Sequence, residues 1–342
     1  LRQTQSWTGV EYPVVMEELS DIAEEFLVFP NAVAPNQQTV RGLYAILTAE
    51  YPKLDYSTPR AYEYLHLDPQ TRPPALPALL AEAGYRTVYI QAADLDYMDK
   101  EEFLRAMGYR ELHGRELFKE SYAVSPWGPD DKTFYHGSLE RLHALARHGE
   151  PWFATLLNVG THHPYTVPDS FARDYDSRKF AAVHYLDQAI GEFYRGLDRA
   201  GILDQTLVVV VSDESHGVVG QPYGQYWPLM MIRGPGITPG MEPARVSQID
   251  LAPTLVSYLG VESARHFPGR VNLLAPGETA ERRLIAFGRY LSPARGVVYE
   301  DLGRGRLRRF APGSNLYARE YEPVMVNREA TELVGSLTGA AD

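Results

Sequence analysis

A group of polar side chains follows an apolar run in the second half of the chain. Asp213, Glu214 and His216 come directly after the continuous apolar run Val208–Val211. Parallel sheets place ligands just beyond the carboxyl ends of their strands, so these side chains are the first candidates for chemistry. A carboxylate and an imidazole that leave one strand together suit a metal ion. The alternative is that the aspartate only caps the next helix.

Two further apolar runs end in the same way. His162 and His163 follow the run 152–157 and precede Pro164, and Gln91 follows the run 86–90. A histidine pair by itself is also compatible with exposed polar side chains that bind nothing. Together with the carboxylates after Val211, the pair favours a divalent metal held by oxygen and imidazole, of the zinc or manganese type.

A candidate nucleophile lies near the start of the chain. The segment 34–42 reads as a loop that enters a helix, with Thr39 at or next to the helix N-terminus. Free backbone N–H groups at that end stabilise anions, so the Thr39 hydroxyl is a candidate nucleophile. The alternative is that Thr39 merely caps the helix.

The elements that position these residues alternate along the chain. Strand-like runs at 86–90, 152–158, 206–211 and 228–232 are separated by helix-length segments at 39–49, 75–83, 131–147, 180–200 and 249–259. Continuous apolar strands between helices predict an α/β fold: a doubly wound, mostly parallel sheet with helices on both faces. After about residue 280, short strand candidates at 283–287, 296–299 and 307–310 predict a small C-terminal subdomain. We therefore expect a catalytic domain over 1–280 and a subdomain over 281–342.

The composition excludes several classes of protein. Lys and Arg number 33 against 44 Asp and Glu, a net charge of −11, so the chain lacks the basic field that nucleic acid requires. There is no cysteine, which removes disulfides, thiolate metal sites and cysteine nucleophiles. The chemistry is therefore left to His, Asp, Glu, Ser and Thr.

The order of short motifs resembles that of a known superfamily. From about Glu18 to Leu274 the chain resembles the alkaline-phosphatase/sulfatase superfamily, within it the lipoteichoic acid synthase and phosphoglycerol transferase branch. The resemblance is carried by segments 29–32, 83–87, 108–109, 127–131, 161–165, 183–193, 201–206, 212–213, 233–236 and 248–255. It implies an alkaline-phosphatase-like α/β fold and an enzyme that transfers substituted phosphate groups.

The resemblance also implies a mechanism and a set of site residues. Thr39 matches a metal-activated nucleophile that forms a phosphothreonine intermediate, Asp213 matches a metal carboxylate, and His163 matches the histidine that contacts the phosphate. We expect His162 to face solvent or to bond to backbone. The implied metal is one divalent ion, Mn²⁺ first, with Mg²⁺ or Zn²⁺ as alternatives. Trp127 and Arg41 are further expected substrate contacts.

Three features depart from the family pattern. The pattern has adjacent Asp and His, whereas here two residues separate Asp213 from His216, so that either His216 reaches the metal or Glu214 replaces it. The family's first-strand carboxylate is expected upstream of Leu1. In the lipoteichoic acid synthases, a His, a Trp and an Arg bind the glycerol phosphate. At these three positions this chain has Gln91, Met98 and Lys100, respectively.

The expected substrates are lipid or glycan phosphodiesters carrying phosphoglycerol or phosphoethanolamine. We expect an extracytoplasmic domain near a membrane, attached through a segment upstream of residue 1. Two rival functions are weighed. The first rival is a sulfatase, which relies on the Cys or Ser of a Cys/Ser-x-Pro-x-Arg motif. Residues 37–41 contain no Cys, Ser or Pro, which argues against sulfate-ester hydrolysis by that route. A catalytically inactive binding domain of the same fold is the other rival.

Overall fold

The computed structural model describes residues 1–2, 14–35, 37–52, 62–214, 227–244, 246–261, 267 and 272–275, together with the backbone of five strands between 284 and 326. The chain divides into two compact units. Unit 1 comprises Leu1–Leu27, Pro77–Val209 and Ile232–Gly240, and unit 2 comprises Val28–Leu76, Val210–Met231 and Met241–Asp342. Each unit is described by itself.

The sheet of unit 1 has three parallel strands in the order β4-β3-β7. These are β4 (Glu111–His113), β3 (Arg86–Gln91) and β7 (Trp152–Leu157). β3 is rich in β-branched and aromatic residues, which favour a strand, and its centre is fully buried. Gln91 pairs in register with Leu157, so the segments after β3 and β7 leave the sheet at the same edge.

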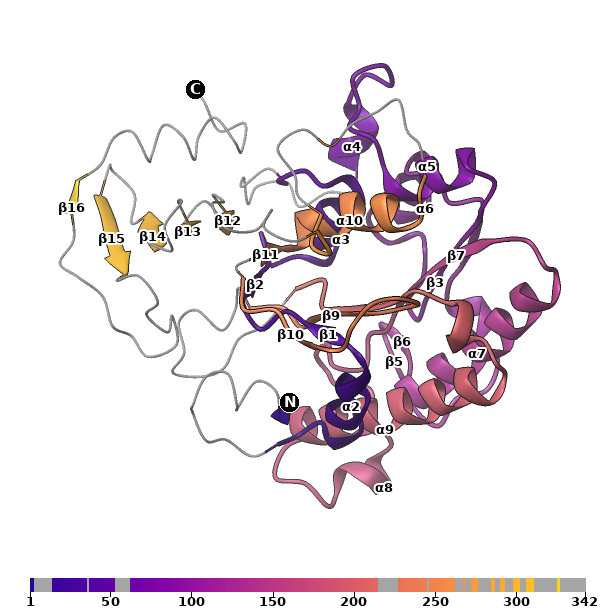
Figure 1. The fold of residues 1–342 in the computed structure, drawn as a ribbon. Helices are drawn as coiled ribbons and strands as arrows, with labels where there is room; N and C mark the ends of the chain where they lie inside the picture. The colour runs from indigo at the N-terminus through magenta and orange to yellow at the C-terminus, as the bar shows by residue number, and fades with distance from the viewer. Residues whose placement is uncertain are drawn as a thin grey trace. The chain divides into compact units, whose positions relative to one another are not determined.

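Two long helices of unit 1 lie alongside each other (Figure 1). α7 (Asp131–Arg147) begins after Asp130, whose side chain accepts a hydrogen bond from the Thr133 N–H at 3.1 Å. α9 (Arg178–Arg199) begins after Ser177, which caps it in the same way. Unit 1 also contains the short strands β5 (Val124–Ser125) and β6 (Gly128–Pro129), and the helices α5 (Leu76–Glu82, whose first residue belongs to unit 2), α6 (Lys100–Ala106) and α8 (Asp169–Ala172).

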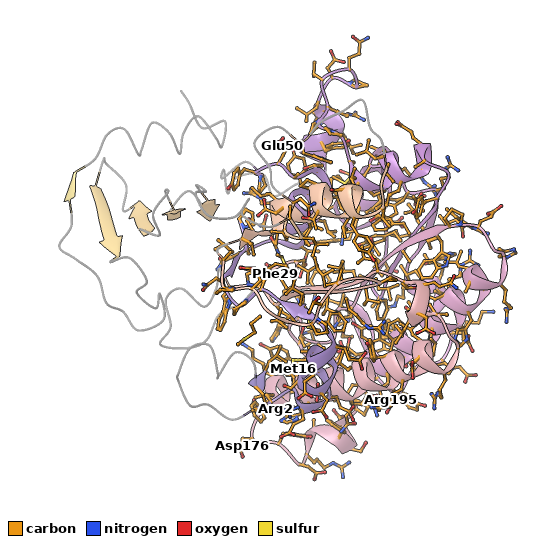
Figure 2. The ribbon with its side chains drawn as sticks, viewed as in Figure 1. Arg2, Met16, Phe29, Glu50, Asp176 and Arg195 are labelled. Carbon is orange, nitrogen blue, oxygen red and sulfur yellow. The ribbon has the colours of Figure 1, made fainter. Side chains whose placement is uncertain are left out.

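The short helix α2 (Glu17–Ile22) is fixed to α9 by a buried carboxylate. Asp187 accepts hydrogen bonds from the backbone N–H of Glu18 at 3.0 Å and of Leu19 at 2.8 Å. Arg195, labelled in Figure 2, donates to the Glu18 side chain from the next turns of α9. These bonds hold the N-terminal segment against the helix layer of unit 1.

A second sheet has four short strands in the order β10-β1-β9-β8. They are β10 (Gly240–Met241), β1 (Leu27–Val28), β9 (Met230–Arg233) and β8 (Val208–Val211). β8 leads directly into Ser212 and Asp213. The Ser212 N–H donates to the Leu229 carbonyl at 2.9 Å, which continues the pairing beyond the end of β8.

Unit 2 contains the helix that was expected to carry the nucleophile. α3 (Thr39–Thr48) ends at Ala49, which adopts a left-handed conformation. The other described elements before residue 262 are α4 (Tyr62–His66), the parallel pair β2 (Ala32–Val33) and β11 (Val246–Ser247), the 3₁₀ turn η6 (Gln248–Asp250) and α10 (Leu251–Tyr258). Ser247 and Asp250 form a reciprocal capping box at the start of η6.

After residue 280 the backbone forms one antiparallel sheet in the order β12-β13-β14-β15-β16. The strands are β12 (Leu284–Ala286), β13 (Tyr290–Ser292), β14 (Val298–Asp301), β15 (Arg306–Phe310) and β16 (Met325–Val326). They belong to unit 2. The division into domains at residue 280 stays a prediction.

The arrangement confirms the prediction of an α/β protein, with parallel strands in unit 1 and helices close to their expected bounds. The helix expected over 249–259 starts as a 3₁₀ turn, because the capping box shapes its first residues. None of the described helices is long and apolar enough to cross a membrane.

Candidate active site

Thr39 is the first residue of α3, as expected, but it does not cap the helix. The N-cap is Gln38, which is extended and makes no side-chain capping bond. The first turn of α3 also contains no acidic residue. The alternative role of Thr39 as a helix cap is therefore wrong. As the first residue of α3, Thr39 lies at the helix end where backbone N–H groups and the helix dipole favour an anion.

One turn further along, α3 touches the segment that follows β8. A Cβ atom added to Gly42 would lie 2.1 Å from the Asp213 carbonyl oxygen and 2.8 Å from its carbonyl carbon. Only a glycine allows so close an approach of two backbones. Residues three apart share a helix face, so the face of α3 that carries Thr39 is the one that meets Asp213. The structure thus brings the helix of Thr39 and the carboxylate segment together within unit 2.

Two adjacent carboxylates lie in this segment. The Glu214 N–H donates to Asp213 Oδ1 at 2.9 Å, and both side chains are partly buried. Burial, and then the neighbouring charge of Asp213, raise the pKa of Glu214 to about 8. A cation held by these carboxylates would relieve that repulsion, and oxygen ligands suit Mg²⁺ or Mn²⁺. The donor chemistry therefore fits a divalent metal.

The ligand set is incomplete in the part of the chain that the structure describes. His216 lies outside the described residues. Among those described, no three His, Cys, Asp or Glu side chains are grouped closely enough to hold a metal ion. The choice between His216 and Glu214 as the second ligand stays open.

Gln248 also holds the backbone of the carboxylate segment. Its amide nitrogen donates to the Ser212 carbonyl at 2.5 Å and to the Asp213 carbonyl at 3.1 Å, and the residue is fully buried. In the sequence, Gln248 is recognisable only as part of a short motif, and this contact is not predicted. Arg41, an expected substrate contact, is also buried in unit 2, with 3% of its surface exposed.

In unit 1, Gln91 and Lys100 are brought together. The Lys100 ammonium donates to Gln91 Oε1 at 3.1 Å, and the Gln91 amide donates to the carbonyls of Ala93 and Asp94. Lys100 is the first residue of α6 and is 7% exposed. The two residues before it, Met98 and Asp99, both have positive φ angles, of 58° and 55°. Such strain in non-glycine residues is common at functional sites, and here it directs the chain into the turn that carries Lys100.

The two histidines of unit 1 have different surroundings. The His162 ring lies 4.5 Å from the Trp127 ring, between centroids, and its Nδ1 is 2.7 Å from the His163 carbonyl oxygen. The bond from His162 to backbone is the outcome expected for that residue. His163 is exposed, and its ring lies 5.7 Å from that of Tyr165. The exposed imidazole of the pair therefore belongs to His163.

The expected substrate residues of unit 1 gather around the carboxyl ends of β3 and β7. Gln91 is the last residue of β3, and the segment that contains His162 follows the neighbouring strand β7. Trp127 lies between β5 and β6, and a Cβ on Gly128 would lie 2.2 Å from the Ala92 carbonyl oxygen, so this hairpin touches the end of β3. Whether His163, Lys100 and Trp127 share a cavity with Thr39 of unit 2 stays a prediction.

Comparison with known proteins decides the family. The family model described as Sulfatase matches residues 3–261. The chain belongs to the Sulfatase family. It is 24% identical to lipoteichoic acid synthase 1 of Bacillus subtilis over 56% of this chain and 34% of that protein. It is 31% identical to phosphoglycerol transferase I of Salmonella arizonae over 40% of this chain and 19% of that protein.

A solved structure supports the same conclusion about the fold. The lipoteichoic acid synthase LtaP from Listeria monocytogenes superposes with a TM-score of 0.77 at 18% identity, over 95% of this chain and 84% of that chain. The expected alkaline-phosphatase-superfamily fold of this Sulfatase family member is thereby confirmed. The matches cover about a third or less of the length of these two curated relatives. The family consists of enzymes, and the roles of individual residues in this chain stay predictions.

Proposed function

We propose that this Sulfatase family member is the catalytic domain of a metal-dependent transferase or phosphodiesterase that acts on phosphoglycerol or phosphoethanolamine diesters. The observation that carries the proposal is the contact of Gly42 with the backbone of Asp213. The contact brings the helix that carries Thr39 against the segment that carries Asp213, which supports their proposed roles as nucleophile and metal ligand. The names of the relatives, lipoteichoic acid synthase and phosphoglycerol transferase, support this choice of substrate.

In the proposed reaction, the Thr39 oxygen attacks the phosphorus of the diester. A Thr39 Oγ1–P bond forms and the P–O bond to the leaving alcohol breaks. Thr39 loses its hydroxyl proton, and the leaving alkoxide gains a proton to become the alcohol. An acceptor hydroxyl or water then attacks the phosphorus and loses its proton. The Thr39 Oγ1–P bond breaks, and Thr39 regains a proton. Attack at the helix N-terminus is favoured because the N–H groups of the first turn stabilise negative charge on the phosphate.

The metal would be held by Asp213 and Thr39, with either His216 or Glu214 as the further ligand. A divalent ion supplies a lowered hydroxyl pKa and neutralises charge on the transferring phosphate. In unit 1, the buried ammonium of Lys100 and the exposed imidazole of His163 are proposed as groups that bind phosphate oxygens. We place the protein outside the cytoplasm and near a membrane, with a lipid or glycan diester as substrate.

A substrate panel tests the proposal. The purified protein is assayed with bis(p-nitrophenyl) phosphate, a glycerophosphodiester and p-nitrophenyl sulfate, with Mn²⁺ and with EDTA. We expect turnover of the diesters that requires the metal, and little release from the sulfate ester. Faster hydrolysis of the sulfate ester would instead support a sulfatase-like hydrolase, and no turnover of any ester would support an inactive binding domain.

A further inference from the structure

A buried carboxylate outside the proposed catalytic set touches the histidine segment. Asp131, the first residue of α7, is 1% exposed. Its Oδ1 accepts hydrogen bonds from Asn158 Nδ2 at 3.0 Å and from the Gly160 N–H at 3.2 Å. Its Oδ2 is buried and has no hydrogen-bond partner among the described residues. We call residues 158–166, which contain His162 and His163, the His loop.

Asp131 is not needed to cap its own helix. The adjacent Asp130 already accepts from the Thr133 N–H at 3.1 Å and from the Thr133 hydroxyl at 2.9 Å. The hydrogen bonds described for Asp131 come from the His loop and not from α7. Burying a second carboxylate opposes folding unless its hydrogen bonds compensate. The interactions of Asp131 therefore act on the His loop.

The fit between Asp131 and the His loop is close. A Cβ atom on Gly160 would lie 2.1 Å from Asp131 Oδ2. The Gly160 carbonyl in turn accepts from the Thr166 N–H at 3.0 Å, which ties the two ends of the loop together. The far end is also fixed by Arg178, whose Nε donates to the Tyr165 carbonyl at 3.0 Å. Asp131 is thus the contact that fixes the start of the loop.

The surroundings of Asp131 shift its pKa in both directions. Burial raises the pKa of this carboxyl to about 7, the bonds from Asn158 and Gly160 lower it, and the charge of Asp130 raises it. The other titratable groups that face it are Tyr135 on α7 and Tyr185 on α9, and the His loop carries His162 and His163. No salt bridge to Asp131 is found in the described part of the chain. Oδ1 can accept from the loop in both protonation states.

We propose that Asp131 is a positioning residue, which fixes the start of the His loop and thereby the placement of His163 toward an anionic phosphate group. The inference rests on the proposed function for its link to substrate. The link to the loop rests on the hydrogen bonds and the close contact alone.

Hydrogen exchange and steady-state kinetics test the proposal together. Exchange of peptides that span 158–168 is measured by mass spectrometry for wild type, Asp131→Ala and Asp131→Asn. Glu192→Gln is the control, since it removes an exposed carboxylate of α9 that pairs with Lys132 and does not contact the His loop. The same proteins are assayed for kcat and KM with bis(p-nitrophenyl) phosphate and Mn²⁺.

We expect Asp131→Ala to speed exchange in the His loop and to raise KM by about tenfold each, because the acceptor of the Asn158 and Gly160 hydrogen bonds is lost. The change in kcat should be smaller. Asp131→Asn keeps an acceptor oxygen and should stay near wild type in both measurements, as should Glu192→Gln. Unchanged loop exchange in Asp131→Ala, or faster exchange without a rise in KM, overturns the proposal.

Two complications have separate outcomes. If Asp131→Ala also exposes α9 to exchange, Asn158→Ala replaces it, because that variant removes a single donor, and the same expectations apply to it. If the wild type turns over no diester, the proposed function fails. The exchange measurement still decides whether Asp131 fixes the loop.

Discussion

At the scale of single residues, the two histidines of the His loop divide two tasks between them. His162 packs on Trp127 and bonds to the His163 carbonyl, so its ring supports the loop. His163 is exposed, and its ring lies beside that of Tyr165. Substitutions of the two histidines are therefore expected to have different effects on substrate binding and on stability.

We expect His163→Ala to raise KM for a phosphodiester by about tenfold or more, because a hydrogen bond to a charged phosphate is lost. The midpoint of thermal unfolding should hardly change. His162→Ala should lower the unfolding midpoint, because the ring contact with Trp127 is lost. The exposed His148 provides the control, as His148→Ala should change neither quantity. A KM that responds to His162→Ala and not to His163→Ala would reverse the assignment.

At the scale of elements, the site depends on how α3 and the segment after β8 pack. The close approach of Gly42 to Asp213 and the two hydrogen bonds from Gln248 both fix the backbone of this segment. Neither residue is proposed to touch a metal or substrate. Both are expected to act through the position of Asp213.

Gly42→Ala should destabilise the protein by roughly 1–3 kcal/mol, because the new methyl group overlaps backbone atoms that cannot rotate away. Gly137→Ala in α7 is the matched control. There the added Cβ would meet only the Phe118 ring, at 3.0 Å, and alanine favours the helix. Urea unfolding measures both variants. Equal stability of the two would show that α3 can shift away from Asp213 at little cost.

Gln248→Leu should weaken binding of Mn²⁺ by about 10–100-fold, since groups that orient metal ligands typically contribute this much. Isothermal titration calorimetry with Mn²⁺ alone measures the effect without any substrate. Gln205→Ala, at an exposed glutamine of unit 1, should bind the metal as the wild type does. Wild-type affinity in Gln248→Leu would mean that the carboxylate segment keeps its position without these bonds.

Local sequence pattern was sufficient to predict the main elements. The helix over 131–147 was predicted at its observed bounds, because Asp130 and Asp131 follow a proline and precede an amphipathic stretch. Thr39 was likewise expected at a helix N-terminus, where it is found. The roles of Gly42, Asp131 and Gln248 were missed because each depends on a contact with a residue distant in the sequence. A buried Asp and a buried Gln look like ordinary polar residues until packing shows what they touch.

At the scale of the whole molecule, stability should depend on pH through the buried Asp131. Its folded pKa of about 7 lies above the ordinary value of 3.8, so the neutral form favours folding. That contribution is fully present below pH 3.8 and is lost as the pH rises through about 7. The groups around it, Asp130, Tyr135 and Tyr185, supply no positive charge to reverse the sign.

Asp131→Asn should therefore become more stable relative to wild type as the pH is raised. We expect a difference in the free energy of unfolding of roughly 1–3 kcal/mol between pH 5 and pH 8, because the variant has no charge to bury. Urea unfolding of both proteins at each pH measures it. Glu192→Gln should show no such trend. A stability difference that does not vary with pH would mean that Asp131 does not titrate between pH 5 and pH 8 in the folded protein.

The central claim of a threonine nucleophile is tested most directly by locating the covalent intermediate. The protein is incubated with a glycerophosphodiester and Mn²⁺, quenched in acid, digested and analysed by mass spectrometry. We predict a phosphate-derived modification on Thr39, absent from Thr39→Ala, which should fold normally because Thr39 makes no capping bond. An unmodified Thr39, together with substantial diester turnover by Thr39→Ala, would contradict the account.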